Sequence, residues 1–121
     1  MEAGDEKWET RFCREEWETV IQYHGIESLE EYLSVVRYGR GIGLHEEERK
    51  QLFRIFEFFI AAKEKRKFLE WNDVLERSRK LLSNSEIALP YTTVIVDEAQ
   101  DMEPAAFRLL RAIVPEKEND L

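Results

Sequence analysis

The sequence has little cysteine and no long apolar run, and these absences exclude several classes of protein. Its one cysteine, Cys13, cannot form an internal disulfide, which excludes a disulfide scaffold and favours a reducing compartment. No apolar stretch approaches the roughly 18 residues that a membrane span needs. The amino end is acidic rather than basic, so no secretory signal peptide is predicted. We therefore expect a cytoplasmic protein that does not enter a membrane.

The sequence also lacks a phosphate-binding loop. Residues 38–43 are glycine-rich, but no lysine follows at the spacing Gly-x-x-x-x-Gly-Lys-Ser/Thr, and a helical pattern precedes them. A flexible connection between helices is the prediction for this stretch. The alternative is that its backbone approaches DNA closely, with Arg37 and Arg40 at phosphates. No internal repeat, metal-ligand cluster or Ser-His-Asp arrangement is visible either.

The composition is that of a globular domain with a modest core. The 121 residues are 43% hydrophobic and 12% aromatic. The net charge of −8 is uneven: residues 1–36 carry −7, residues 37–80 carry +4, and residues 81–121 carry −5. The whole chain should therefore have little nonspecific affinity for DNA, and any phosphate contact should come from the middle third.

Apolar spacing predicts four helices in the first two thirds of the chain. The first covers residues 5–24 and ends at Gly25, and the second begins at a capping box over residues 28–31. The third covers residues 45–67, and the fourth runs from residue 68 through Leu82. A polar loop over residues 83–90 follows.

Basic residues gather at the end of the third predicted helix: Lys63, Lys65, Arg66 and Lys67. Three glutamates stand in its first turn. This gradient suits the helix dipole and explains the basic cluster without any ligand. The alternative interpretation is a weak DNA contact.

The most informative stretch covers residues 91–101. Residues 92–96 are all β-branched and uncharged, which favours a strand buried on both faces of a parallel sheet. The run ends in Asp97 and Glu98, at the strand end where open α/β sheets bind nucleotides. An amphipathic helix should then begin near Pro104. Asp101 is a candidate to cap that helix or to orient nearby loops.

Carboxylates at this position have a clear chemical use. Asp97 could hold Mg²⁺, which prefers oxygen ligands and keeps several waters. Glu98 points another way and could orient or deprotonate an attacking water. Gln100 is an uncharged donor and acceptor that could sense a γ-phosphate or that water.

The stretch Val96-Asp97-Glu98-Ala99-Gln100-Asp101 resembles motif II, the Walker B element, of UvrD/Rep-like superfamily 1 helicases. Those are ATP-driven DNA translocases with RecA-like cores. Pro104 matches a proline that often follows the motif. Residues 68–75 resemble a second family segment that precedes motif II, with Trp71 at its aromatic position. Glu70 departs from the usual aspartate of that segment.

The resemblance implies roles for individual residues. Asp97 would bind Mg²⁺, and Glu98 would be the catalytic base. Gln100 and Asp101 would couple the nucleotide state to movement, and Asp101 would also contribute to cofactor binding. The full-length parent would use Mg²⁺ and ATP and bind single-stranded or partly duplex DNA. The isolated chain, lacking Walker A, is expected to bear no cofactor and to be inactive.

The expected fold class is mainly α: a helical subdomain with one hydrophobic strand and one helix from a P-loop (RecA-like) α/β core. Residues 1–85 would form a helical subdomain like the family's 1B, and residues 86–121 the motif II strand and helix of a truncated ATPase domain. The unpaired strand predicts self-association as a dimer. The alternative is that it collapses as irregular chain onto the helical face of Phe53, Phe56 and Phe59. The alternatives are a free-standing protein-interaction module with a vestigial motif II, or part of a non-helicase P-loop ATPase or repair nuclease subunit. The coding sequence on either side of these residues would distinguish them.

Overall fold

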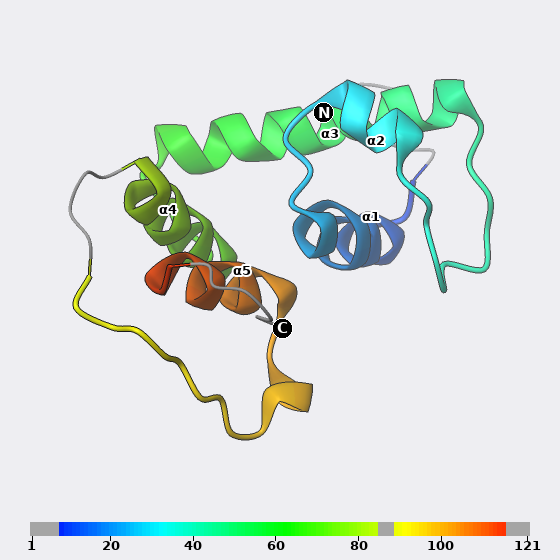
Figure 1. Cartoon of the computed structure of the whole chain (residues 1–121). Helices are drawn as coiled ribbons and strands as arrows, with labels where there is room; N and C mark the ends of the chain where they lie inside the picture. Colours follow the sequence, from blue (N-terminus) through cyan, green and yellow to red (C-terminus); the bar gives the residue numbers. More distant parts are fainter. Residues whose placement is uncertain (1–7, 85–88, 116–121) are drawn as a thin grey trace. The chain divides into compact units, whose positions relative to one another are not determined.

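The computed structural model describes residues 8–84 and 89–115 and is helical where it has regular structure (Figure 1). The chain divides into two compact units, residues 1–68 and residues 69–121. The described part contains no strand, and none of its helices could cross a membrane. The mainly α prediction is confirmed. The elements are α1 (Thr10–Glu16), the π-helix η2 (Trp17–Gln22), α2 (Leu29–Ser34), α3 (Glu46–Lys65), α4 (Trp71–Asn84), the 3-10 turn η3 (Ala99–Asp101) and α5 (Pro104–Ile113).

The predicted helix stop at Gly25 is confirmed. α1 and η2 form one continuous helical stretch, and Gly25 follows it with φ 64°. The Gly25 N–H donates to the Gln22 carbonyl at 3.2 Å, and the Ile26 N–H donates to the Ile21 carbonyl at 2.9 Å. These two bonds form a Schellman motif, which satisfies carbonyls at the helix end and favours glycine at the left-handed position.

α3 ends in the same motif with a lysine in place of the glycine. Lys67 has φ 53°; its N–H donates to the Glu64 carbonyl and the Phe68 N–H donates to the Lys63 carbonyl. A non-glycine residue in this conformation costs on the order of 1–2 kcal/mol. The same backbone geometry is therefore relaxed at one helix end and strained at the other.

The ends of α2 are satisfied by side chains. The Ser28 hydroxyl oxygen accepts from the Glu31 N–H at 3.2 Å, as the capping-box prediction requires. At the other end, Nη1 of Arg49 donates to the carbonyls of Tyr32, Leu33 and Val35. Since Arg49 lies in α3, this contact fixes the short α2 against the longest helix of the unit.

The core of the first unit is largely aromatic. The Trp17 ring lies 5.5 Å from that of Phe56, and the Tyr32 ring lies 5.9 Å from that of Phe53. Burying each such side chain contributes roughly 1.5–3 kcal/mol. α3 thus presents one apolar face to the preceding helices. The buried core residues are Trp17, Val20, Ile21, Ile26, Tyr32, Leu52, Phe53 and Phe56.

A fully buried carboxylate, Glu16, organises the polar part of this unit. It accepts hydrogen bonds from the Tyr32 hydroxyl and from Nε and Nη2 of Arg37, each at 2.6 Å. Nε of Arg40 donates to it at 2.9 Å, and Nη1 of Arg37 donates to the Ile42 carbonyl at 2.7 Å. The carboxylate therefore joins the first helix, α2 and the glycine-rich connection. That connection is confirmed as non-helical.

The second unit consists of α4 packed against α5, with a small core. Leu75 of α4 and Ala105 of α5 are buried. An ion pair links the two helices, because Glu76 accepts from Arg108 at 2.8 Å. The predicted fourth helix and the helix from Pro104 are thus confirmed. The predicted domain boundary at residue 85 follows the domain organisation of the family, whereas the two units above are defined by their internal contacts. The boundary at residue 85 therefore stays a prediction.

We predict that Glu16→Gln destabilises the first unit by on the order of 3 kcal/mol at neutral pH, because two buried guanidinium groups lose their counter-charge. Stability is measured by unfolding in guanidinium chloride, followed by tryptophan fluorescence. The measurements use a Trp71→Phe background, so that the signal comes only from tryptophans of this unit. Glu15→Gln is the matched control, since the Glu15 side chain is 43% exposed and pairs with exposed Arg11 as well as with Arg40. The loss of stability in Glu15→Gln should be much smaller than that in Glu16→Gln.

The same variants give a pH test. Burial raises the pKa of Glu16, but hydrogen bonds from Arg37, Tyr32 and Arg40 outweigh burial, and the pKa lies below its ordinary value of 4.5. The stabilisation is therefore fully present above pH 4.5 and is lost as the pH falls through the folded-state pKa. The stability difference between the wild type and Glu16→Gln should narrow in acid. A pH-independent difference would contradict the assignment.

The two helix ends predict opposite responses to substitution. Lys67→Gly should stabilise the first unit by about 1 kcal/mol, since glycine adopts positive φ without the steric cost. Gly25→Ala should destabilise it by a similar amount for the same reason. Both are measured by the denaturation assay above. A loss of stability in Lys67→Gly would show that the lysine is not strained there.

Candidate functional site

The predicted strand over residues 92–96 is not formed in this chain. The segment is extended without ladder pairing: Val94 and Val96 are half-buried, and Ile95 is 92% exposed. A strand needs a neighbour to satisfy its backbone N–H and carbonyl groups. The described residues supply no second strand, so the backbone of this segment stays unpaired and the Ile95 side chain stays in water.

Asp97 and Glu98 stand at the tip of this extended segment, directly before the turn η3. Both carboxylates are exposed. Glu98 has φ 58° and ψ 40°, the left-handed conformation. Its carbonyl accepts from the Asp101 N–H at 3.1 Å, which closes the turn. A left-handed glutamate is strained, as Lys67 is at the end of α3.

The turn brings two of the predicted site residues together. The side-chain amide of Gln100 donates to Oε2 of Glu98. Asp101 lies in the same turn but does not cap α5, because the cap position is Glu103 and no side-chain capping bond is present there. The capping suggestion for Asp101 is therefore wrong. The reason is spacing, since Met102 and Glu103 are extended and carry the chain beyond its reach.

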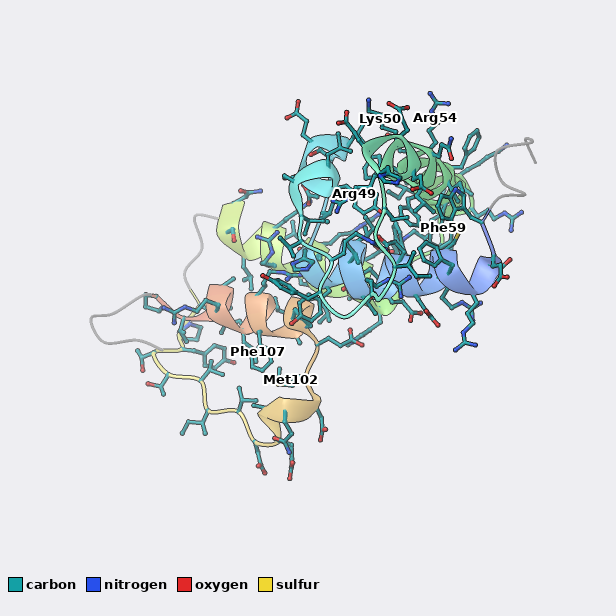
Figure 2. All side chains as sticks on the ribbon, turned by 90° about the vertical axis from the view of Figure 1, so that its right-hand side faces the viewer. Arg49, Lys50, Arg54, Phe59, Met102 and Phe107 are labelled. Carbon is teal, nitrogen blue, oxygen red and sulfur yellow. The ribbon has the colours of Figure 1, made fainter. Side chains whose placement is uncertain are left out.

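The helix after the turn has one face that remains partly uncovered. Figure 2 shows Met102 and Phe107 on the side of α5 toward the turn and the extended segment. Phe107 is exposed, although it belongs to the apolar pattern of the helix. This face and the extended segment together leave apolar surface in water, which a parallel sheet would cover.

The oxygen-rich tip suits one kind of metal site. Within residues 8–84 and 89–115, no three side chains converge as a metal-binding group. Mg²⁺ at nucleotide sites uses one or two carboxylates together with water and substrate phosphates rather than a cage of side chains. An exposed carboxylate such as Asp97, at the end of an extended segment, fits that pattern.

Three of the six basic residues predicted to contact DNA have structural roles inside the first unit. The Arg37 and Arg40 side chains are 4% and 9% exposed and bind Glu16, so a phosphate contact would require this cluster to open. Lys63 is buried, with its nitrogen 5.1 Å from the Trp17 ring and 5.0 Å from the Phe59 ring. Lys65, Arg66 and Lys67 are exposed at the end of α3.

Sequence reasoning missed Glu16, the partner of both arginines. The signal was present, because Glu16 stands within the apolar spacing of Cys13, Trp17 and Val20. A charged residue on the buried face of a helix requires a counter-charge. Its partners Arg37 and Arg40 lie 21 and 24 residues further along the chain.

Comparison with known protein families gives a match over nearly the whole chain. The family model described as the UvrD/REP helicase N-terminal domain matches residues 6–121. No curated protein and no solved structure matches the chain. The family match includes both the helical region and the turn that carries Asp97 and Glu98.

Proposed function

The chain belongs to the UvrD/REP helicase family, and we propose that it supplies the motif II region of an ATP-driven translocase that moves along single-stranded DNA. The observation that carries this proposal is the acidic tip. Adjacent carboxylates, one of them on strained backbone, follow an apolar segment suited to a parallel sheet and precede an amphipathic helix. In a parallel sheet, that order would put Asp97 and Glu98 at the edge where nucleotides bind.

Asp97 and Glu98 take different roles in the proposed reaction. Asp97 would hold Mg²⁺, which when bound neutralises charge on the β- and γ-phosphates. Glu98 would orient the attacking water and accept its proton. The backbone becomes left-handed at Glu98, where the extended segment ends. This change of direction would let the Asp97 and Glu98 side chains take the two different roles.

Gln100 is the proposed link between the base and the rest of the motor. Its amide already donates to the Glu98 carboxylate, so any ligand that attracts this amide changes the environment of the base. A γ-phosphate offers acceptor oxygens of that kind. Gln100, with Asp101 in the same turn, would thus couple the nucleotide state to movement on DNA.

Neighbouring parallel strands from the parent ATPase domain would complete the site. They would pair the backbone of residues 92–96 and cover apolar side chains such as Ile95 and Phe107. In their absence, pairing of the same segment with a second copy of this chain stays a proposal. Lys65, Arg66 and Lys67 remain the proposed phosphate contacts among the basic residues considered above, because the other three lie inside the fold.

We predict that Glu98→Gln in the parent protein retains ATP binding and loses hydrolysis by on the order of 10²–10⁴-fold, because the base is removed while the side chain keeps its size. Binding is measured with a fluorescent nucleotide, and hydrolysis by phosphate release with Mg²⁺ and single-stranded DNA. Glu103→Gln is the matched control, since Glu103 is an exposed glutamate further along the same segment. It should hydrolyse ATP normally.

One result would contradict the proposal, and another would contradict the expected inactivity of this chain alone. Near-normal hydrolysis by the Glu98→Gln parent would remove Glu98 from the base role. Phosphate release by the present chain alone, abolished by the same substitution, would show a phosphate site without the Gly-x-x-x-x-Gly-Lys-Ser/Thr pattern, which this sequence does not contain. The chain alone is expected to release none.

A further inference from the structure

We infer that the ion pair between Glu76 and Arg108 positions the turn that carries Glu98, which makes both of them positioning residues for the proposed reaction. Glu76 lies in α4 and Arg108 lies in α5. The inference deepens the proposed function and rests on it for the role of Glu98. The placement of the turn itself can be tested in this chain without ATP.

The carboxylate of Glu76 is held by two guanidinium groups that come from different helices. Nε of Arg108 donates to its Oε1 at 2.8 Å, and Nη2 of Arg108 lies 2.8 Å from the same oxygen. Nε and Nη2 of Arg79 donate to its Oε2 at 3.2 and 3.1 Å. Arg79 belongs to α4, as Glu76 does. Of these two arginines, only Arg108 links one helix to the other.

The pair lies beside the apolar contact between the two helices, which Figure 1 shows packed side by side. Leu75, the neighbour of Glu76, is buried, and so is Ala105, three positions before Arg108. Apolar burial has no preferred direction, so it holds the helices together without fixing their register. A charge-assisted hydrogen bond is directional. The side chains of Glu76 and Arg108 are 17% and 31% exposed, so water and salt screen the pair less than a fully exposed one.

A short connection links the position of α5 to that of the acidic turn. The Asp101 N–H donates to the Glu98 carbonyl and closes the turn. Only Met102 and Glu103 separate the turn from α5, which begins at Pro104. The proline ring fixes φ at that point and restricts the residue before it. A shift of α5 along α4 would therefore move Glu98 as well.

Such a shift matters because a general base acts only within hydrogen-bond reach of the proton that it accepts. A misplacement of about 1 Å can lower the rate of an enzyme by on the order of 10²-fold. The Glu76–Arg108 pair thus affects hydrolysis through the position of Glu98, although neither residue is placed at the nucleotide.

The first test measures the turn in the 121-residue chain. Order parameters of the Asp101 and Met102 amides, from relaxation of the amide nitrogens, report whether the turn is held. Arg108→Gln should lower both of them from about 0.85 toward 0.6. Arg79→Gln is the matched control, because it removes a guanidinium group from the same carboxylate and leaves the link between the helices. It should keep both order parameters unchanged.

A conservative variant separates the pair from the general stability of the unit. Arg108→Lys should keep the turn ordered, because both donors of Arg108 meet one oxygen of Glu76 and a single ammonium group can take their place. Circular dichroism of each variant shows whether the helices remain folded.

The second test measures ATP hydrolysis by the parent protein. Arg108→Gln should lower kcat on the order of tenfold and change KM by less than about twofold, because Glu98 acts in the transition state and not in ATP binding. In a Glu98→Gln background the same substitution should cause no further loss, since it acts through Glu98. Arg79→Gln should hydrolyse ATP normally.

Three outcomes would overturn the inference. In the first, the Asp101 and Met102 amides are as ordered in Arg108→Gln as in the wild type. In the second, Arg108→Gln loses helical circular dichroism and Arg108→Lys leaves the turn disordered, which would make the pair a general support of the unit. In the third, Arg108→Gln slows the Glu98→Gln parent as much as it slows the wild-type parent.

Failure of the proposed function would look different. A parent that hydrolyses no ATP, or that hydrolyses it normally with Glu98→Gln, would contradict the proposed function. The order parameters of this chain would still decide whether the Glu76–Arg108 pair positions the turn.

Discussion

The buried carboxylate of Glu16 is the interaction on which the first unit depends. One charge without exposure to water holds the Tyr32 hydroxyl and two guanidinium groups, and through them α2 and the glycine-rich connection. An isolated charge is too costly to bury, so the carboxylate and the two guanidinium groups require one another. The aromatic core alone packs helix against helix, whereas this cluster also fixes a stretch with no regular structure.

Under the proposed function, the second unit is completed by a sheet that the described chain does not supply. Residues 92–96 have the composition of a central strand, yet their backbone has no partner in the described chain and Ile95 remains in water. The acidic turn at their end keeps a defined form, with Glu98 left-handed and Gln100 bonded to it. The proposed function accounts for both features, since it adds a parallel sheet beside residues 92–96 and a nucleotide at the acidic turn.

The predictable and unpredictable parts of the structure follow from the range of the interactions involved. Gly25, the Ser28 cap and Pro104 act within a turn of the helix, so the helix ends could be predicted from sequence. Arg37 and Arg40 could not be placed correctly, because their partner Glu16 is distant in the sequence and lies in α1. The strand prediction rests on β-propensity, which describes a residue in a sheet and not a segment without neighbours.

The central claim is that residues 92–96 become a buried parallel strand that presents Asp97 and Glu98 to the nucleotide. Amide hydrogen exchange at Val94, Ile95 and Val96, compared between this chain and the parent helicase, tests it most directly. The account predicts rapid exchange in this chain alone and strong protection in the parent, because ladder hydrogen bonds then hold the amides. Equally rapid exchange in both proteins would contradict the claim.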